Sequence, residues 1–286
     1  VNAVEKYLKK TPRKERIFMI PALMGNFPDI ERLRRLSKKY KIFFILDSCD
    51  TNGSYWNKKP VGKFADLVTS SFYSSHIITT GGGGGIIMTN DEKIKKRLQI
   101  LRGWGRASAM TAESERIEDR FKYTIDNTPY DGKLVFTEIG FNMQVTELHG
   151  AFGVAQLKKL NKFARDRKKN FKKILQYFKK KPQFILPKQY PQVNTPWQVF
   201  PVTLAPDCPF NREKLVIFLG KHDIQTRPLH VGNITRHPAF RKWRKPFKNA
   251  DYVMRNSFII GCHPGLTQKH LDYLFEVFEK FLKKNI

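Results

Sequence analysis

The sequence predicts an α/β fold, because short apolar runs alternate with amphipathic stretches along its first half. Residues 17–20 and 42–46 are apolar runs of strand length, and residues 29–40 between them repeat apolar side chains at helical spacing. A strand, a helix and a second strand in succession indicate neighbouring parallel strands, since the helix returns the chain to the start of the sheet.

Further elements extend this pattern. Residues 67–69 and 85–89 have the composition of strands, and residues 91–101 have helical periodicity. Residues 103–133 are polar and poor in aliphatic side chains, so we expect a long surface excursion there. Residues 146–178 predict one or two long helices with an apolar face made of Leu148, Phe152, Ala155, Leu157, Leu160 and Phe163.

Two domains are expected. The Lys-Lys-Pro sequence that ends at Pro182 interrupts the long helical stretch, because proline does not continue a helix. One strand and two helices are predicted beyond it, at residues 199–204, 212–221 and 267–282. We therefore expect a large domain at residues 1–181 and a smaller C-terminal α/β domain at residues 182–286.

Composition narrows the class of protein. The chain has 286 residues, of which 41% are hydrophobic, enough for two buried cores. No apolar run approaches the roughly 20 residues that cross a bilayer, and the first residues lack an apolar signal core, so we expect a cytoplasmic protein. Cys49, Cys208 and Cys262 show no CxxC pair and supply neither a disulfide framework nor a four-thiolate metal site. The chain starts without methionine and in the middle of a pattern, so we expect a fragment of a longer product.

The net charge of +28 raises the alternative of a nucleic-acid-binding protein. The basic residues are spread along the whole chain, and several repeat at helical spacing beside apolar positions. They form no zinc-finger spacing and no RNA-binding aromatic signature. Solvated helix faces are therefore the simpler interpretation, and a positive field also favours encounter with an anionic substrate.

Asp47 is placed where the apolar strand at residues 42–46 ends. Ligands of open α/β sheets bind at the carboxyl ends of the strands, so this carboxylate is a candidate for a ligand contact. A turn cap is the alternative for the residue taken alone, since Asp47 and Ser48 begin a loop.

The most informative stretch places His76 just before five consecutive glycines at residues 81–85. An imidazole carries protons near neutral pH, as a general base must. The glycines permit positive φ angles and a close backbone approach, which suits a cofactor or a subunit contact as well as a flexible loop.

The residues around His76 resemble the cofactor-lysine segment of the DegT/DnrJ/StrS sugar aminotransferases, in which Ser-Phe-x-x-x-Lys precedes a glycine-rich strand. In that family the lysine forms a Schiff base with pyridoxal phosphate (PLP), and His76 stands at the lysine position. An imidazole is not a primary amine and does not form that bond. The same replacement marks the family's pyridoxamine phosphate (PMP) dependent sugar 3-dehydratases. The resemblance thus implies an aspartate-aminotransferase-like fold (PLP fold type I), with an incomplete large domain, and a PMP enzyme whose general base is His76.

Other segments extend the resemblance over nearly the whole chain. Residues 46–53 resemble the family segment whose first aspartate meets the pyridine nitrogen, which assigns this contact to Asp47 and places Asp50 near the ring hydroxyl. Ser71 matches a serine that binds the cofactor phosphate. Asn142 matches an asparagine that reaches the cofactor phosphate of the partner subunit, so the resemblance implies a homodimer with shared active sites.

The C-terminal segments resemble the substrate region of the PMP dehydratases, which assigns Arg227, Asn233 and Arg236 to substrate binding. The implied substrate is a nucleotide-linked 4-keto-6-deoxyhexose, on the route to dideoxysugars of surface polysaccharide (lipopolysaccharide O-antigen). In the implied reaction the PMP amine condenses with the 4-keto group, His76 takes a proton from the cofactor, and the 3-hydroxyl leaves.

Departures from the family pattern keep an alternative open. The dehydratases that hold a two-iron cluster carry four cysteines after Trp-Gly-Arg, whereas residues 103–130 contain none, so we expect no iron–sulfur cluster and no other metal. The product is then completed by hydrolysis, with an amino acid as amine donor, or by an external reductase. The family's N-terminal phosphate-binding segment does not precede Val1, and Gly82 replaces an acidic residue. An aminotransferase relative with altered or lost catalysis is the alternative.

Overall fold

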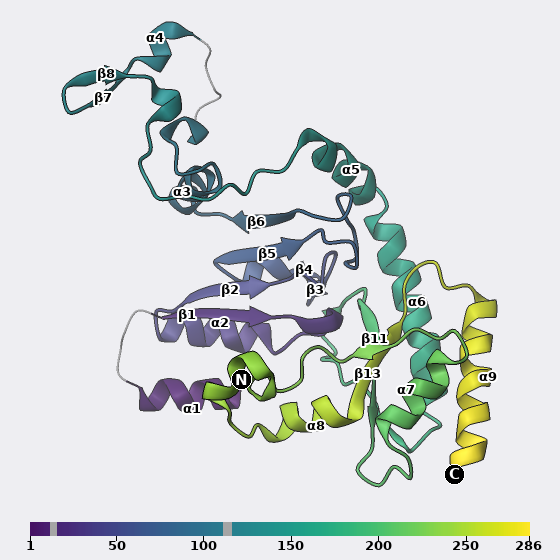
Figure 1. Cartoon of the computed structure of the whole chain (residues 1–286). Helices are drawn as coiled ribbons and strands as arrows, with labels where there is room; N and C mark the ends of the chain where they lie inside the picture. Colours follow the sequence, from purple (N-terminus) through teal and green to yellow (C-terminus); the bar gives the residue numbers. More distant parts are fainter. Residues whose placement is uncertain (12–15, 111–115) are drawn as a thin grey trace.

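The computed structural model describes residues 1–11, 16–110 and 116–286 (Figure 1). The helices are α1 (Asn2–Lys10), α2 (Ile30–Lys39), α3 (Glu92–Arg102), α4 (Ile117–Arg120), α5 (Glu147–Leu157), α6 (Leu160–Phe178), α7 (Arg212–Gly220), α8 (Lys248–Asn256) and α9 (Gln268–Asn285). The strands are β1 (Ile17–Pro21), β2 (Phe43–Asp47), β3 (Tyr55–Trp56), β4 (Lys59–Pro60), β5 (Leu67–Ser71), β6 (Gly85–Thr89), β7 (Tyr123–Ile125), β8 (Thr128–Tyr130), β9 (Phe184–Ile185), β10 (Val193–Asn194), β11 (Val199–Leu204), β12 (Arg227–Pro228) and β13 (Ser257–Gly261).

The first layer is a four-stranded sheet in the order β1-β2-β5-β6 (Figure 1). Strands β1, β2 and β5 run parallel, whereas β6 pairs antiparallel with β5. The predicted strands and the predicted helix between the first two of them are therefore present. The antiparallel direction of β6 follows from the connection, since no helix lies between β5 and β6 to carry the chain back across the sheet.

One face of this sheet is buried under α1 and α2. Phe18, Phe44 and Leu46 lie on this face and join α1 and α2 in a single apolar cluster. Helix α2 begins at Asp29, whose carboxylate accepts a hydrogen bond of 2.9 Å from the Arg32 N–H and so satisfies one of the free amides of the first turn.

The opposite face of the sheet, here called the bare face, is largely uncovered by the described residues, although Leu67 of β5 is buried on it. Side chains alternate between the two faces of a strand, so the neighbours of the buried positions point the other way. Ile17 and Met19 on β1 are accordingly exposed. Pro21 and Asp47, paired across β1 and β2, belong to this same face. Asp47 thus stands at the carboxyl end of β2 on the uncovered side.

The surface excursion predicted at residues 103–133 carries α4 and the β7–β8 hairpin and extends away from the sheet (Figure 1). The backbones of Gly103 and Asn142 pair where it leaves and rejoins the body. Gly105 in the left-handed region (φ 84°) fits closely there, because a Cβ at this position would lie 1.9 Å from the Glu138 carbonyl oxygen.

The predicted long helix is divided into α5 and α6, with Lys158 and Lys159 at the break. Helix α6 places Phe171, Ile174 and Phe178 in a second apolar core. Helix α5 has no buried residue. Its predicted apolar face is therefore present but faces solvent in the described chain.

The second core lies around an antiparallel sheet in the order β12-β13-β11-β9. Phe200 and Val202 of β11 pack there with side chains of α6, α7 and α9, and α6 lies beside α9 (Figure 1). Because the end of α6 belongs to this core, its packing favours grouping it with the C-terminal unit. The domain boundary near residue 182 stays a prediction. None of the described helices combines the length and the apolarity needed to cross a bilayer.

Candidate functional site

The candidate site lies where β1, β2 and β5 end. The chain segments that follow these strands carry Met24, Asp50 and His76 respectively. The strands are parallel, so their carboxyl ends meet at one edge of the sheet. Figure 1 shows this edge facing the C-terminal unit, next to β11 and the start of α6.

Asp50 and His76 form a close pair. The Asp50 Oδ1 atom lies 3.1 Å from His76 Nδ1, and the two side chains are only 13% and 16% exposed. The other carboxylate oxygen, Oδ2, accepts a hydrogen bond of 2.8 Å from the Met24 backbone N–H. In neutral histidine one ring nitrogen carries the proton, and a carboxylate beside Nδ1 places it there. The Nε2 atom is then left with a lone pair, as a general base requires.

Gln198 also reaches this pair, although nothing in the sequence pointed to it. Its Nε2 atom donates to the Ser75 carbonyl oxygen over 3.2 Å and lies 3.3 Å from His76 Nδ1. Gln198 precedes β11 by one residue and is 122 residues from His76 in the chain. Such a contact depends on tertiary structure, and the Thr-Pro-Trp-Gln sequence around it carries no functional pattern.

Asp47 and Ser71 end β2 and β5, and the sheet register puts them on the bare face. Asp47 accepts a hydrogen bond of 3.1 Å from the Cys49 N–H. Ser71 Oγ accepts one of 3.1 Å from the Tyr73 N–H, which leaves its own hydroxyl proton for another acceptor. Close by, the half-buried Asn52 has a buried amide nitrogen with no hydrogen-bond partner among the described residues, although its Oδ1 accepts from Ser70.

The thiol of Cys49 stands between the two aspartates in the sequence but is not a nucleophile. Burial, reinforced by the Asp47 carboxylate, raises the pKa of the Cys49 thiol to about 12. The reactive form of cysteine is the thiolate, which is scarce at neutral pH under these conditions. Acid–base chemistry at this edge therefore belongs to the imidazole and the carboxylates.

Asn142 lies apart from this group. Its backbone pairs with Gly103 beside the end of α3, and its side chain is exposed. No described contact joins it to His76 within one chain. It stands in an exposed apolar stretch in which Ile139 is 96% exposed and Phe141, Met143 and Val145 are also exposed.

The three predicted substrate residues differ in their exposure and in the hydrogen bonds that their side chains make. Arg227 on β12 is exposed, and its described hydrogen bond goes to the neighbouring Thr226 carbonyl. Asn233 is buried and donates 2.8 Å to the Asp251 carboxylate, while Arg236 donates to both oxygens of the same carboxylate. Arg236 and Asn233 hold the pKa of Asp251 far below its usual range. Both residues thus also brace the loop between β12 and α8.

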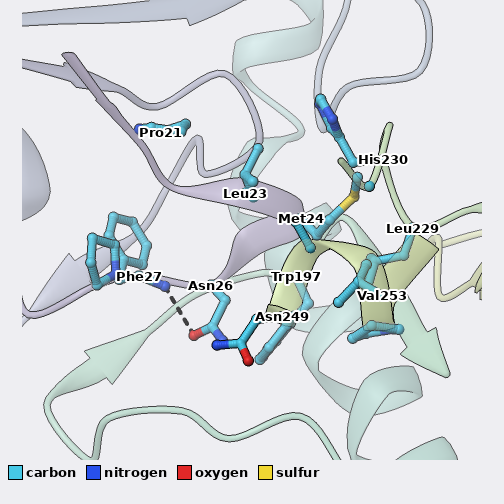
Figure 2. A pocket seen from close by; sticks show the side chains of 14 residues that line it. Pro21, Leu23, Met24, Asn26, Phe27, Trp197, Leu229, His230, Asn249 and Val253 are labelled. Atoms are coloured by element: carbon cyan, nitrogen blue, oxygen red, sulfur yellow. Dashed lines mark hydrogen bonds between the residues drawn. The ribbon is translucent and has the colours of Figure 1, made fainter. Parts of the chain in front are cut away.

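An open hollow of about 520 Å³ adjoins this group of residues at Met24. Figure 2 shows the side chains that line it. Met24 and Trp197 belong to its wall, together with Leu229 and His230 from the loop after β12. Most of its lining is apolar. Among residues 1–11, 16–110 and 116–286, no group of three or more His, Cys, Asp or Glu side chains is placed to hold a metal ion.

A mostly parallel sheet with polar side chains at its strand ends, joined to a smaller antiparallel unit, is the arrangement of an aminotransferase-like protein. The chain belongs to the DegT/DnrJ/EryC1/StrS aminotransferase family, whose model matches residues 2–279.

Two named relatives of the chain are a lipopolysaccharide biosynthesis protein and a deoxysugar-nucleotide 3-dehydratase. The chain is 35% identical over 280 residues to the lipopolysaccharide biosynthesis protein RfbH of Salmonella typhimurium. This match covers 95% of this chain and 64% of that protein. The chain is 33% identical over 279 residues to dTDP-4-dehydro-2,6-dideoxy-D-glucose 3-dehydratase of Saccharopolyspora spinosa, with 95% of this chain and 60% of that protein covered. The chain thus spans less than two thirds of either relative.

A solved structure confirms the predicted aminotransferase-like fold. The Escherichia coli GDP-4-keto-6-deoxy-D-mannose 3-dehydratase, solved with hydrated PLP, superposes with a TM-score of 0.82 at 26% identity. The match covers 96% of this chain and 70% of that one.

Proposed function

We propose that the protein is a PMP-dependent dehydratase that removes the 3-hydroxyl of a nucleotide-linked 4-keto-6-deoxyhexose, on a route to dideoxysugars of surface polysaccharide. The observation that carries the proposal is the Asp50–His76 pair. A histidine stands where the family has its cofactor lysine, and its Nδ1 is held by a carboxylate 3.1 Å away. The protein therefore has a base, rather than an amine, at the reacting edge of the sheet.

The residues present fit a phosphorylated pyridine cofactor. Asp47 offers a carboxylate for a protonated ring nitrogen, and Ser71 has a hydroxyl proton free for a phosphate oxygen, both on the same bare face of the sheet. When bound, PMP supplies an amine for the sugar keto group and a ring that withdraws electrons. Asp50 then holds the imidazole so that Nε2 takes up a proton and returns it to the leaving hydroxyl.

The proposed substrate class follows two of the relatives that are named for their reactions. Those relatives act on dTDP- and GDP-linked deoxy sugars. The exposed Arg227 is a candidate for an anionic group of such a nucleotide, and the positive net charge favours its approach. With no cysteine at residues 103–130, completion falls to hydrolysis with an amino acid as amine donor, or to an external reductase. A cytoplasmic location stays a prediction.

The test replaces the base in the full-length protein. His76→Asn is expected to lower the turnover of a nucleotide-linked 4-keto-6-deoxyhexose by about 10²–10⁴-fold while PMP affinity stays nearly unchanged. The matched control is His222→Asn, a histidine whose ring bonds to the Phe218 carbonyl in the C-terminal unit. Retention of most of the turnover in His76→Asn rejects the proposal.

The reverse substitution separates the proposal from its alternative. His76→Lys restores the primary amine and is expected to give a borohydride-stable link to PLP, which the natural protein lacks. A natural full-length protein that binds PMP but dehydrates no such sugar supports an aminotransferase relative with lost catalysis. One that binds nucleic acid and no cofactor supports a basic binding protein.

In this proposal the active enzyme is a homodimer with shared sites. Asn142 lies in the exposed apolar stretch at residues 139–145, next to α5, whose Leu148 is 82% exposed. Contiguous exposed apolar surface of this kind marks an interaction site. A second copy that covers it would carry Asn142 toward the cofactor phosphate of its partner.

Subunit mixing tests the shared site. His76→Asn and Asn142→Ala proteins, each inactive alone, are expected to recover activity when exchanged into heterodimers, because one of the two sites then combines both intact residues. A preparation that contains only Asn142→Ala homodimers is the control. No recovery despite demonstrated exchange, or a monomer in light scattering at working concentration, contradicts the dimer model.

A further inference from the structure

Gln198 links the C-terminal unit of the protein to the loop that carries His76. Its side-chain Nε2 donates to the Ser75 carbonyl oxygen, one residue before the imidazole. A carbonyl oxygen accepts only, so the amide nitrogen, rather than the amide oxygen, must face it. The same nitrogen lies 3.3 Å from His76 Nδ1. Since Asp50 takes the Nδ1 proton, this second contact packs the amide against the edge of the ring.

The backbone of Gln198 is fixed on both sides. Its N–H donates to the Met24 carbonyl oxygen over 3.0 Å, and its own carbonyl accepts from Arg167 Nη1 over 2.7 Å. Arg167 is buried on α6, and this burial lowers the pKa of its guanidinium. A buried guanidinium needs acceptors for its donors, and the Gln198 carbonyl supplies one to Nη1, so Arg167 ties the segment before β11 to α6.

The residue before Gln198 is equally constrained. Trp197 has a φ of 40°, an unusual conformation for a bulky side chain, and its ring stacks on Phe171 with 4.1 Å between centroids. Gly25 lies against it so closely that a Cβ there would be 2.5 Å from the Trp197 Cα. The glycine thus lets the turn after β1 touch the segment that holds Gln198.

These contacts form a closed cycle that joins four residues. The Met24 N–H binds Asp50, Asp50 binds His76, Gln198 binds the His76 loop, and the Met24 carbonyl accepts from Gln198. Three members follow strands of the first sheet, and the fourth, Gln198, directly precedes β11 of the second sheet. The orientation of the imidazole is therefore set partly by the place of the C-terminal unit, which also carries the candidate substrate residues.

We propose that Gln198 is a positioning residue for His76: it holds the Ser75–His76 backbone so that Nδ1 stays on Asp50 and Nε2 faces the reacting atoms. This inference rests on the proposed function for its catalytic meaning. Loss of the Gln198 amide lets the loop move and lets the ring proton redistribute between the two nitrogens. The result is a slower proton transfer at an unchanged substrate site.

The experiment uses full-length protein with isotope-labelled histidine nitrogens. Gln198→Met keeps the length and volume of the side chain without its amide, and Gln198→Leu removes the amide with a shorter apolar side chain. Gln192→Ala is the control, since the Gln192 side chain is exposed and the described hydrogen bond of this residue is made by its backbone carbonyl, which accepts from the Asn57 N–H. His76→Asn assigns the His76 signals.

The expected result is a His76 tautomer shift with a matching loss of turnover. In the natural protein Nδ1 carries the proton and Nε2 does not, whereas both Gln198 variants show the proton shared between the nitrogens. With substrate, kcat falls about tenfold while KM stays within about twofold, and Gln192→Ala behaves as the natural protein. The temperature of unfolding of each variant is measured in parallel. If one of the two Gln198 variants does not fold, the measurements are made on the other variant.

The two possible failures are distinguishable. If the ring nitrogen signals of His76 do not change in either folded Gln198 variant, the positioning role is overturned, whatever the activity of those variants. A natural protein that dehydrates no 4-keto sugar, but whose His76 signals do change on loss of Gln198, overturns the proposed function and leaves the positioning role in place.

Discussion

Helices α5 and α6 follow each other in the chain, but only α6 has buried side chains. Helix α6 is rich in lysine and arginine and still buries Phe171, Ile174 and Phe178 in the second core. Helix α5 carries fewer charges and several large apolar side chains, and none of its residues is buried. Apolar composition therefore does not decide which helix is covered within this chain; the presence of a partner surface does.

The same contrast divides the first sheet. The face under α1 and α2 is packed, whereas the face of Asp47 is bare. The bare face, residues 139–145 and α5 are the parts for which we propose ligands or a second copy. The covered regions stabilise the fold, and the uncovered regions are those to which the proposed function assigns a ligand or a second copy.

The largest expected effect separates the two helices directly. Phe178→Ala removes a ring that is 1% exposed and is expected to lower the free energy of unfolding by about 3–5 kcal/mol. Phe152→Ala on α5, where the ring is 47% exposed, is expected to change it by no more than about 0.5 kcal/mol. Denaturant unfolding of dilute, monomeric protein measures both. Equal losses would show that α5 is packed in solution and would break the comparison.

A smaller effect is expected on self-association. Leu148→Asn places an amide on the exposed face of α5 and is expected to weaken dimer formation tenfold or more, because burying a leucine contributes about 1.5–3 kcal/mol. Sedimentation equilibrium gives the dissociation constant. Lys169→Asn, at an exposed position of α6, is the control and should leave it unchanged. If Leu148→Asn leaves the association intact, α5 is not in the interface.

The strand and helix pattern was readable from the sequence because it depends on local periodicity. The bounds of β6 and β11 match the prediction, and Asp29 caps α2 where the first turn was expected. The position of Asp47 at a strand end also followed from the sequence. The two faces of a helix can be read in the same way, but what covers them cannot, which is why the exposure of α5 was not foreseen.

The inner contacts of the site could not be read from the sequence. Asp50 was assigned to a ring hydroxyl from the family resemblance, and in the structure its carboxylate binds His76 and the Met24 amide. Gln198 was missed altogether. Both contacts depend on how three strand ends and the segment before β11 come together, and no spacing in the sequence encodes that meeting.

The smallest expected effect concerns the loop after β12, in which Asn233 and Arg236 bind the Asp251 carboxylate. Arg236 and Asn233 lower the pKa of Asp251 below its unfolded value of about 3.9, so the stabilisation is present above that pH and is lost as the pH falls toward the folded value. Acidification from about pH 5 should therefore lower the unfolding temperature of the natural protein more than that of Asp251→Asn, which is already less stable at pH 7. Calorimetry across this range measures the difference, with Asp207→Asn, an exposed carboxylate of the same unit, as the control. Parallel curves for the natural protein and Asp251→Asn would show that the loop contributes no acid dependence and that only the apolar cores set the stability of this unit.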